Sequence, residues 1–157
     1  MSIQVAVCGP RACDDELRGL AFEVGRLLAE RGAVVICGGY GGVMAAAAKG
    51  ARSAGGTVVG ILSRADRAHA NPYLSIAIPT GIGEARNAVI VNSGDAVIVV
   101  GGSWGTLSEL AFAVRGGRVP VIQLGRGWEV RDADGAPLPG VRAARTAQEA
   151  VDRTGLW

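Results

Sequence analysis

The segment Gly101-Gly102-Ser103-Trp104-Gly105-Thr106-Leu107-Ser108-Glu109 joins a glycine-rich turn to the start of a helix. Residues 95–100 before it (DAVIVV) form a short β-branched run that is typical of a buried parallel strand, and residues 110–114 after it continue at helical spacing. The first N–H groups of such a helix lack intrahelical partners and point, with the positive end of the helix dipole, towards any approaching anion. The segment therefore predicts a phosphate site with the Glu109 carboxylate beside it.

Strands and helices alternate on both sides of this segment. We expect strands at 3–8, 33–37, 57–62, 75–78, 95–100 and 119–124, and helices at 14–31, 43–54, 81–92, 104–115 and 146–153. Residues 63–74 and 125–145 are predicted loops, the second with a turn at Asp134-Gly135. This alternation predicts an α/β fold: one Rossmann-like domain over 1–157, with a doubly wound parallel sheet covered by helices on both faces. Its core would span 3–124 and its C-terminal extension 125–157.

Composition narrows the possible functions. The chain has 157 residues, of which 49% are hydrophobic and 19% charged, which favours a globular protein over a disordered one. Its 25 glycines indicate several tight turns, and a net charge of +2 without basic runs argues against a nucleic-acid partner. No apolar run suggests a membrane span or signal peptide, so we expect a cytoplasmic protein. Cys8, Cys13 and Cys37 form no C-x-x-C pair, which favours structural cysteines and no metal site.

The candidate site is expected at the carboxyl ends of the predicted strands. In a doubly wound sheet of order 3-2-1-4-5-6, ligands bind outside these ends, where the strand order reverses. Arg86 and Glu109 lie in the first turns of the helices after the fourth and fifth strands, so both would face one crevice. We predict them as the catalytic pair. The predicted phosphate or ligand contacts are Gly9, Gly38, Gly39, Gly42, Thr80, Asn87, Gly102, Ser103, Trp104, Gly105 and Thr106.

Each feature also has a purely structural explanation. The glycines at 38–42 could form only a tight turn, and Glu109 could only complement the helix dipole. Trp104 could stack on a base or pterin ring, or close its turn against the sheet. Tyr40 could line the pocket mouth or contact a partner subunit, while Arg64, Arg67 and His69 are predicted on the surface. The sequence argues against a nicotinamide dinucleotide site, because no G-x-G-x-x-G follows the first strand and no acidic residue ends the second. The nucleoside-triphosphatase loop is absent too.

Three motifs carry a resemblance to a known family. They are Gly38-Gly39-x-x-Gly42-Val43-Met44, Thr80-Gly81-x-Gly83-Glu84-Ala85-Arg86-Asn87 and Gly102-x-x-Gly105-Thr106-x-x-Glu109. Together they resemble the Rossmann-like proteins that were once called lysine decarboxylases, which include the LONELY GUY phosphoribohydrolases and the molybdenum cofactor carriers. The hydrolase hallmark is P-G-G-x-G-T-x-x-E, preceded by M-x-x-R-K. The resemblance places Arg86 at the motif arginine and Glu109 at the motif glutamate.

The departures from this hallmark favour the carrier branch. Gly101 replaces the proline, Ser103 the second glycine, Gly83 the methionine and Asn87 the lysine, which removes a cation from the pocket. The resemblance implies a homodimer or homotetramer and a small phosphorylated ligand, either a nucleoside monophosphate or a phosphorylated pterin such as molybdenum cofactor.

Three functions remain open. A carrier would hold this ligand as cargo and require no cofactor of its own. A phosphoribohydrolase would cleave the N-glycosidic bond of a nucleoside 5′-monophosphate with Arg86 and Glu109. A former enzyme retained as an oligomeric scaffold is the third possibility.

Overall fold

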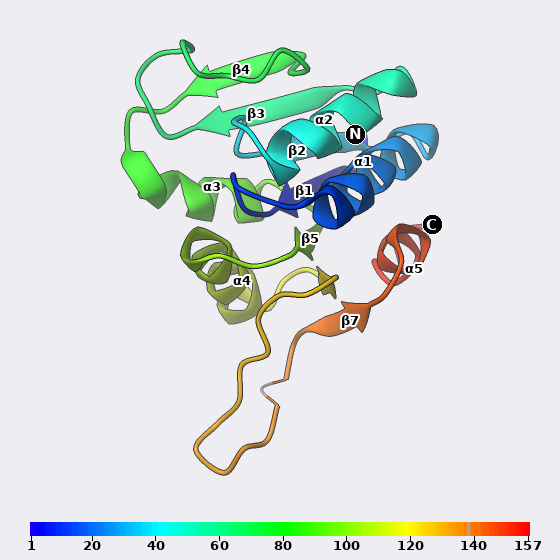
Figure 1. Cartoon of the computed structure of the whole chain (residues 1–157), viewed down its shortest axis with the longest axis vertical. Coiled ribbons are helices and arrows are strands. Elements are labelled where there is room, and N and C mark those ends of the chain that lie inside the picture. The colour runs from blue at the N-terminus through cyan, green and yellow to red at the C-terminus, as the bar shows by residue number, and fades with distance from the viewer. Residues whose placement is uncertain (138) are drawn as a thin grey trace.

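The computed structural model describes residues 1–137 and 139–157, and its centre is a seven-stranded sheet in the order β4-β3-β2-β1-β5-β6-β7 (Figure 1). All neighbouring strands pair in parallel. The strands are β1 (Gln4–Cys8), β2 (Val34–Cys37), β3 (Val58–Leu62), β4 (Ile76–Pro79), β5 (Ala96–Val100), β6 (Val121–Leu124) and β7 (Arg142–Ala144). The helices are α1 (Asp15–Glu30), α2 (Val43–Ser53), η1 (Gly83–Ala85, a 3₁₀ turn), α3 (Arg86–Asn92), α4 (Trp104–Gly116) and α5 (Ala147–Asp152). The predicted α/β Rossmann-like fold is confirmed.

Two apolar layers flank the sheet. Alternate residues of each central strand point to opposite faces, so Val5 and Val7 join one core while Ala6 and Cys8 join the other. Helices α1, α2 and α5 cover the first face, and α3 and α4 cover the second (Figure 1). Both faces of the inner strands are therefore buried, which explains why residues 95–100 are apolar throughout rather than alternating.

The strand order differs from the expected one in the position of the fourth strand. β4 pairs with β3 at the sheet edge, because the 63–75 connection carries the chain outward. Helix α3 then crosses back, and β5 pairs with β1. The strand order therefore reverses between β1 and β5, so the turns after these two strands, at 9–11 and 101–105, meet at the reversal point.

Two local predictions also need correction. The helix expected at 81–92 begins as a 3₁₀ turn and becomes α-helical only at Arg86, since Gly81 and Gly83 have positive φ values of 68° and 62°. The loop expected at 125–145 contains β7, which pairs with β6. The β7 sequence Arg-Ala-Ala contains no β-branched or large apolar residue, so it does not indicate a strand. Residue 138 of that predicted loop lies outside the described residues.

Helices α1 and α2 pack in direct backbone contact at two glycines. A Cβ atom on Gly25 would lie 2.0 Å from the Ala47 carbonyl oxygen, and one on Gly50 would lie 1.9 Å from the Phe22 carbonyl oxygen. No side-chain rotation can relieve an overlap with backbone. This contact holds α2, and with it the turn after β2, against the first face of the sheet.

We expect Gly25→Ala to lower the free energy of unfolding by about 3 kcal/mol, because the two helices must move apart to admit the methyl group. Urea unfolding checks this. Gly19→Ala on the same helix is the control, since its Cβ would meet nothing within 4 Å and should stabilise the helix by about 0.5–1 kcal/mol. Equal urea midpoints for Gly25→Ala and the wild-type protein would contradict the backbone contact.

Candidate functional site

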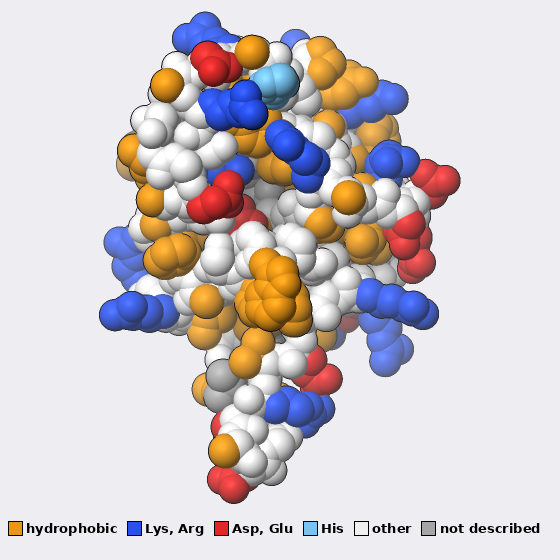
Figure 2. Space-filling view, turned by 60° about the vertical axis from the view of Figure 1, so that its left-hand side comes forward, with side chains coloured by type: hydrophobic (Ala, Val, Ile, Leu, Met, Phe, Trp, Pro, Cys, Tyr) orange, Lys and Arg blue, Asp and Glu red, His pale blue; other side chains and the backbone are white. Residues whose placement is uncertain are grey.

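A cavity of about 300 Å³ opens at the carboxyl end of the sheet, around the reversal point. Figure 2 shows this face of the molecule with a hollow that has Lys or Arg side chains above it and acidic side chains beside it. The cavity is lined by Gly9, Pro10, Arg11, Tyr40, Met44, Ser63, Arg64, Glu84, Arg86, Asn87, Ser103, Gly105, Thr106 and Glu109. Arg86 and Glu109 therefore share one cavity, and the glycine-rich turn before α4 forms part of its wall.

The amino-terminal turn of α4 carries its own cap. Ser103 is the N-cap residue: its hydroxyl accepts a hydrogen bond from the Thr106 N–H at 3.3 Å and lies 2.9 Å from the Thr106 hydroxyl. A glycine here, as in the hydrolase hallmark, would leave that N–H free. An anion at this turn would meet the Gly105 backbone and two hydroxyl groups, and it would compete with Ser103 for the Thr106 N–H.

The other two predicted residues of this turn, Gly102 and Trp104, are not among the residues that line the cavity. Trp104 is 78% exposed, and its ring lies 5.2 Å from that of Trp128, centre to centre. The Trp128 indole donates a hydrogen bond to the Ser103 carbonyl, and a Cβ on Gly102 would lie 3.1 Å from the Trp128 ring. The loop after β6 thus braces the turn from outside.

Arg86 is a buried cation at the cavity floor. Its side chain is 6% exposed, and its Nη1 donates a 3.0 Å hydrogen bond to the Ile61 carbonyl at the end of β3. Its Nε has no partner. In the described parts of the chain, no carboxylate lies within 4.0 Å of the guanidinium group. A buried cation with no ion-pair partner at this distance is costly, so this group is suited to an anionic ligand.

Gly38 positions Arg86 instead of facing the cavity. A Cβ at Gly38 would lie 2.3 Å from Arg86 Nη1 and 2.5 Å from Met44 Sδ. Only a glycine leaves room for the guanidinium to reach Ile61. Gly38 is not among the residues that line the cavity, and its neighbours are Arg86 and Met44, so its contact with a ligand stays a prediction.

Glu109 lines the same cavity from the second turn of α4, not the first turn expected from the sequence, and is 7% exposed. Burial raises the pKa of Glu109 to about 7, against the opposing effects of the Arg86 cation and the neighbouring Cys8 thiol. A carboxyl with such a pKa exchanges its proton near neutral pH. It is therefore suited either to general acid–base chemistry or to a hydrogen bond with a neutral ligand group.

Asn87, at the position of the motif lysine, ties two helices together. It is 2% exposed, and its Nδ2 donates to the Ser108 hydroxyl at 3.0 Å and to Glu84 at 3.3 Å. It lines the cavity without adding charge. Where the hydrolase hallmark has a lysine, this chain has a neutral link between η1 and α4.

Of the four remaining predicted residues, Gly9 lines the cavity, whereas Gly39, Gly42 and Thr80 do not. Gly9 lines the cavity, but a Cβ there would lie 2.3 Å from Val43. Gly39 and Gly42 have positive φ values of 79° and 62° and lie outside the cavity wall. Thr80 also lies outside it, and its hydroxyl donates a hydrogen bond to the Leu62 carbonyl at 2.7 Å. These four residues shape the turns that carry the cavity.

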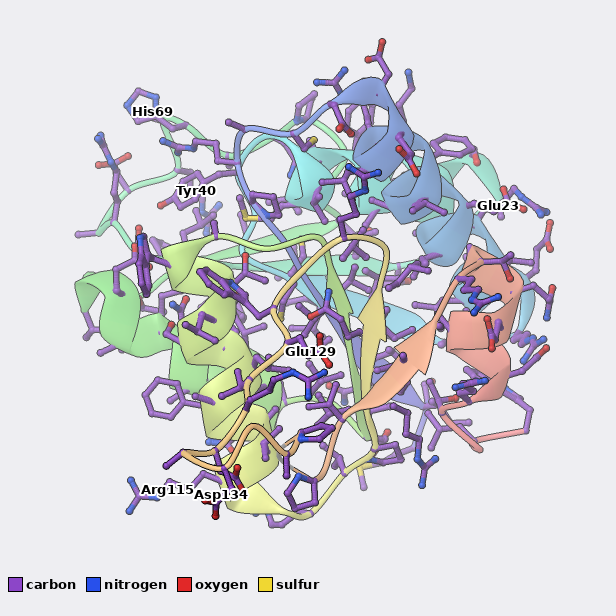
Figure 3. The ribbon with its side chains drawn as sticks, turned by 60° about the horizontal axis from the view of Figure 1, so that its bottom comes forward. Glu23, Tyr40, His69, Arg115, Glu129 and Asp134 are labelled. Atoms are coloured by element: carbon purple, nitrogen blue, oxygen red, sulfur yellow. The ribbon has the colours of Figure 1, made fainter. Side chains whose placement is uncertain are left out.

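Several cavity residues were not predicted as ligand contacts, although Met44 and Glu84 belong to the quoted motifs and Arg64 was predicted on the surface. Pro10, Arg11, Met44, Ser63, Arg64 and Glu84 line the wall without belonging to the predicted set. Arg11 carried one usable signal, since it directly follows the first βα turn. Tyr40 does line the cavity, and Figure 3 shows it at the end of β2, with His69 farther out on the loop after β3.

Neither a metal-binding cluster nor a membrane-spanning helix is found in the described part of the chain. Within residues 1–137 and 139–157, no three His, Cys, Asp or Glu side chains are grouped to hold a metal ion. Over the same ranges, every helix is too short or too polar to cross a membrane.

Comparisons with known proteins agree with the fold. An uncharacterized protein of Archaeoglobus fulgidus is 44% identical over 156 residues, which cover 96% of this chain and 93% of that protein. The molybdenum cofactor binding protein of the phototrophic bacterium Rippkaea orientalis matches with a TM-score of 0.86 and 31% identity, covering 97% of this chain and 94% of that one. The molybdenum cofactor carrier protein of Chlamydomonas reinhardtii matches with a TM-score of 0.81 and 29% identity, covering 97% and 95%. The model of the SLOG cluster4 family matches residues 2–150, and the chain belongs to that family.

Proposed function

We propose that this chain is a carrier that binds a small phosphorylated ligand in the cavity at the carboxyl end of the sheet. The observation that carries the proposal is Arg86, a buried guanidinium with an unpartnered Nε and no carboxylate within ion-pair distance among the described residues. A phosphate is the natural counter-ion for such a group, because its oxygens match the guanidinium fork. The cargo we favour is a phosphorylated pterin such as molybdenum cofactor, and a nucleoside monophosphate is the second choice.

Different residues of the cavity would bind different groups of the ligand. The phosphate would lie at the start of α4, where the Gly105 backbone and the Ser103 and Thr106 hydroxyls face the cavity. Arg86 would approach it from the floor. Glu109 would accept a hydrogen bond from, or donate one to, a hydroxyl or amine of the ligand, since its pKa of about 7 allows either state. No resident cofactor is part of this scheme.

Two further points support carriage over turnover. The solved structures described above are named as a cofactor binding protein and a cofactor carrier protein. In this chain Asn87 replaces the motif lysine and is committed to Ser108 and Glu84. The cavity thus lacks one cation that the hydrolase hallmark supplies.

One observation favours a second candidate, a phosphoribohydrolase. Glu109 is buried and has a pKa of about 7, which suits a group that positions the attacking water and stabilises an oxocarbenium-like ribosyl centre. Release of free base from nucleoside 5′-monophosphates, followed by liquid chromatography, tests this candidate. Release by the wild-type protein that is lost in Glu109→Gln would replace the carrier proposal with an enzyme.

The carrier proposal is tested by native mass spectrometry of the purified protein. We expect a bound phosphorylated molecule, identified by chromatography after denaturation, in the wild-type protein and in the control Arg67→Ala, whose arginine lies outside the cavity wall. We expect Arg86→Ala to lose it, with affinity for added ligand reduced about 100-fold. Equal ligand occupancy in Arg86→Ala and wild type would contradict the proposed site.

The same spectra report the oligomer. We also propose a homodimer or homotetramer in the cytoplasm. Ile82, Val89 and Phe112 are 52%, 40% and 46% exposed, which leaves apolar surface on the α3–α4 side for a second copy. A monomer mass at micromolar concentration would contradict this part.

A further inference from the structure

Tyr40 contacts three arginines of the cavity, two at its rim and one at its floor. The Arg11 guanidinium lies 4.9 Å from the centre of the Tyr40 ring, and the buried Arg86 lies 5.6 Å from it. The Tyr40 hydroxyl accepts a hydrogen bond from the Arg64 N–H at 3.2 Å and lies 3.2 Å from the Ser63 hydroxyl. The buried ring thus contacts the Arg11 guanidinium and the Arg64 backbone, and both residues line the cavity.

The backbone at both rim positions is fixed. Arg64 is held by the hydrogen bond to Tyr40, and its own carbonyl accepts from the Gly81 N–H at 3.1 Å. On the other side, the Pro10 carbonyl accepts from the Val43 N–H at 3.0 Å, and Gly42 packs so tightly that a Cβ would lie 2.1 Å from the Arg11 carbonyl oxygen. The backbone positions that carry the Arg11 and Arg64 side chains are therefore fixed.

Both guanidinium groups are available to a ligand. Over residues 1–137 and 139–157, neither the Arg11 nor the Arg64 side chain donates a hydrogen bond or forms an ion pair within the chain. Both residues are exposed at the cavity mouth, whereas Arg86 is buried at the floor.

The cavity wall carries more positive charge than is needed to bind one anionic group. Three arginines line the wall against two carboxylates, Glu84 and Glu109, and the second of these is partly protonated at neutral pH. One phosphate at α4 and Arg86 leaves the rim arginines without a partner.

We propose that the cavity takes a ligand with two separated oxyanions: a phosphate at the start of α4 and a second oxyanion between Arg11 and Arg64. This inference rests on the proposed function and narrows its ligand class. The second oxyanion could be another phosphate or the metal oxyanion of a pterin cofactor, and the shared chemistry is a multiply charged oxygen cluster that accepts guanidinium hydrogen bonds.

Isothermal titration calorimetry tests this with adenosine 5′-monophosphate and adenosine 3′,5′-bisphosphate. In the wild-type protein we expect the bisphosphate to bind about tenfold more tightly, from charge-assisted hydrogen bonds at the rim. The advantage should vanish in the double variant Arg11→Gln/Arg64→Gln, while binding of the monophosphate stays within about twofold. The matched control Arg67→Gln changes an exposed arginine of the same loop that lies off the cavity wall and should keep the full advantage.

The outcomes separate this inference from the proposed function. Equal affinity for the two nucleotides, or an advantage that survives in the double variant, would overturn the second subsite alone. Failure of both nucleotides to bind the wild-type protein would count against the nucleotide form of both proposals, and a tungstate arm then decides the subsite. Tungstate soaked into wild-type crystals at micromolar concentration should lie between Arg11 and Arg64 and disappear in the double variant. Its absence there, together with failed nucleotide binding, would overturn the subsite.

Discussion

Gly38→Ala is expected to weaken ligand binding about 100-fold, although it removes no charged or polar group from the cavity. The added Cβ would lie 2.3 Å from Arg86 Nη1, so the guanidinium must leave its hydrogen bond with Ile61 and move from the cavity floor. Gly38 does not have a positive φ, so the backbone itself accepts alanine. Titration calorimetry with the ligand recovered from the protein measures the loss.

Gly41→Ala is the matched control for this effect. It lies in the same turn, also without positive φ, and its Cβ would meet only Arg11 Cγ at 3.7 Å, an ordinary contact. Wild-type affinity is expected for it. If Gly38→Ala also binds with wild-type affinity, then the position of Arg86 does not control binding.

Glu109→Gln is expected to raise stability above neutral pH by about 3 kcal/mol, the equivalent of a pKa moved from 4.5 to about 7 by burial. The folded protein binds this proton more tightly than the unfolded chain does. The contribution to stability is therefore full below pH 4.5, falls as the pH rises to about 7, and stays low above that. The glutamine variant carries no such ionisation and should lose this part of the pH dependence.

Urea unfolding at pH 5 and pH 8 measures the effect. Glu84→Gln is the control, since this exposed carboxylate lines the same cavity. The wild-type protein should lose more stability than Glu109→Gln between the two pH values, and Glu84→Gln should behave like the wild type. Parallel pH profiles for wild type and Glu109→Gln would show that Glu109 does not titrate in the folded protein.

Most helices and strands could be predicted from the local sequence pattern, but the pairing of the edge strands could not. The apolar run at 95–100 indicates a strand buried on both faces, and the sheet confirms it. Nothing in the pattern of residues 76–79 says that this strand pairs with β3 at the edge, because pairing depends on how the 63–75 connection runs. Residues 142–144 pair with β6 although two of them are exposed, so they carry no strand signal.

Site residues could be predicted where their place in a helix after a parallel strand brings them to the cavity. Arg86 and Glu109 reach one cavity because both lie at the start of helices that follow parallel strands. The glycines were harder to interpret, since a sequence shows that space is needed but not what fills it. At Gly38 the space is filled by Arg86. The backbone of Arg64 is held by a hydrogen bond to the hydroxyl of Tyr40, 24 residues away, which no local pattern encodes.

The position of the bound phosphate tests the central claim most directly. A crystal structure of the protein with the ligand it carries should show the phosphorus atom at the start of α4, with oxygens within hydrogen-bond distance of Thr106 and of the Arg86 guanidinium. A ligand bound elsewhere, for instance in the groove between α3 and α4 lined by Phe112 and Arg118, would contradict it. A phosphate in the cavity that leaves Arg86 without contact would contradict it equally.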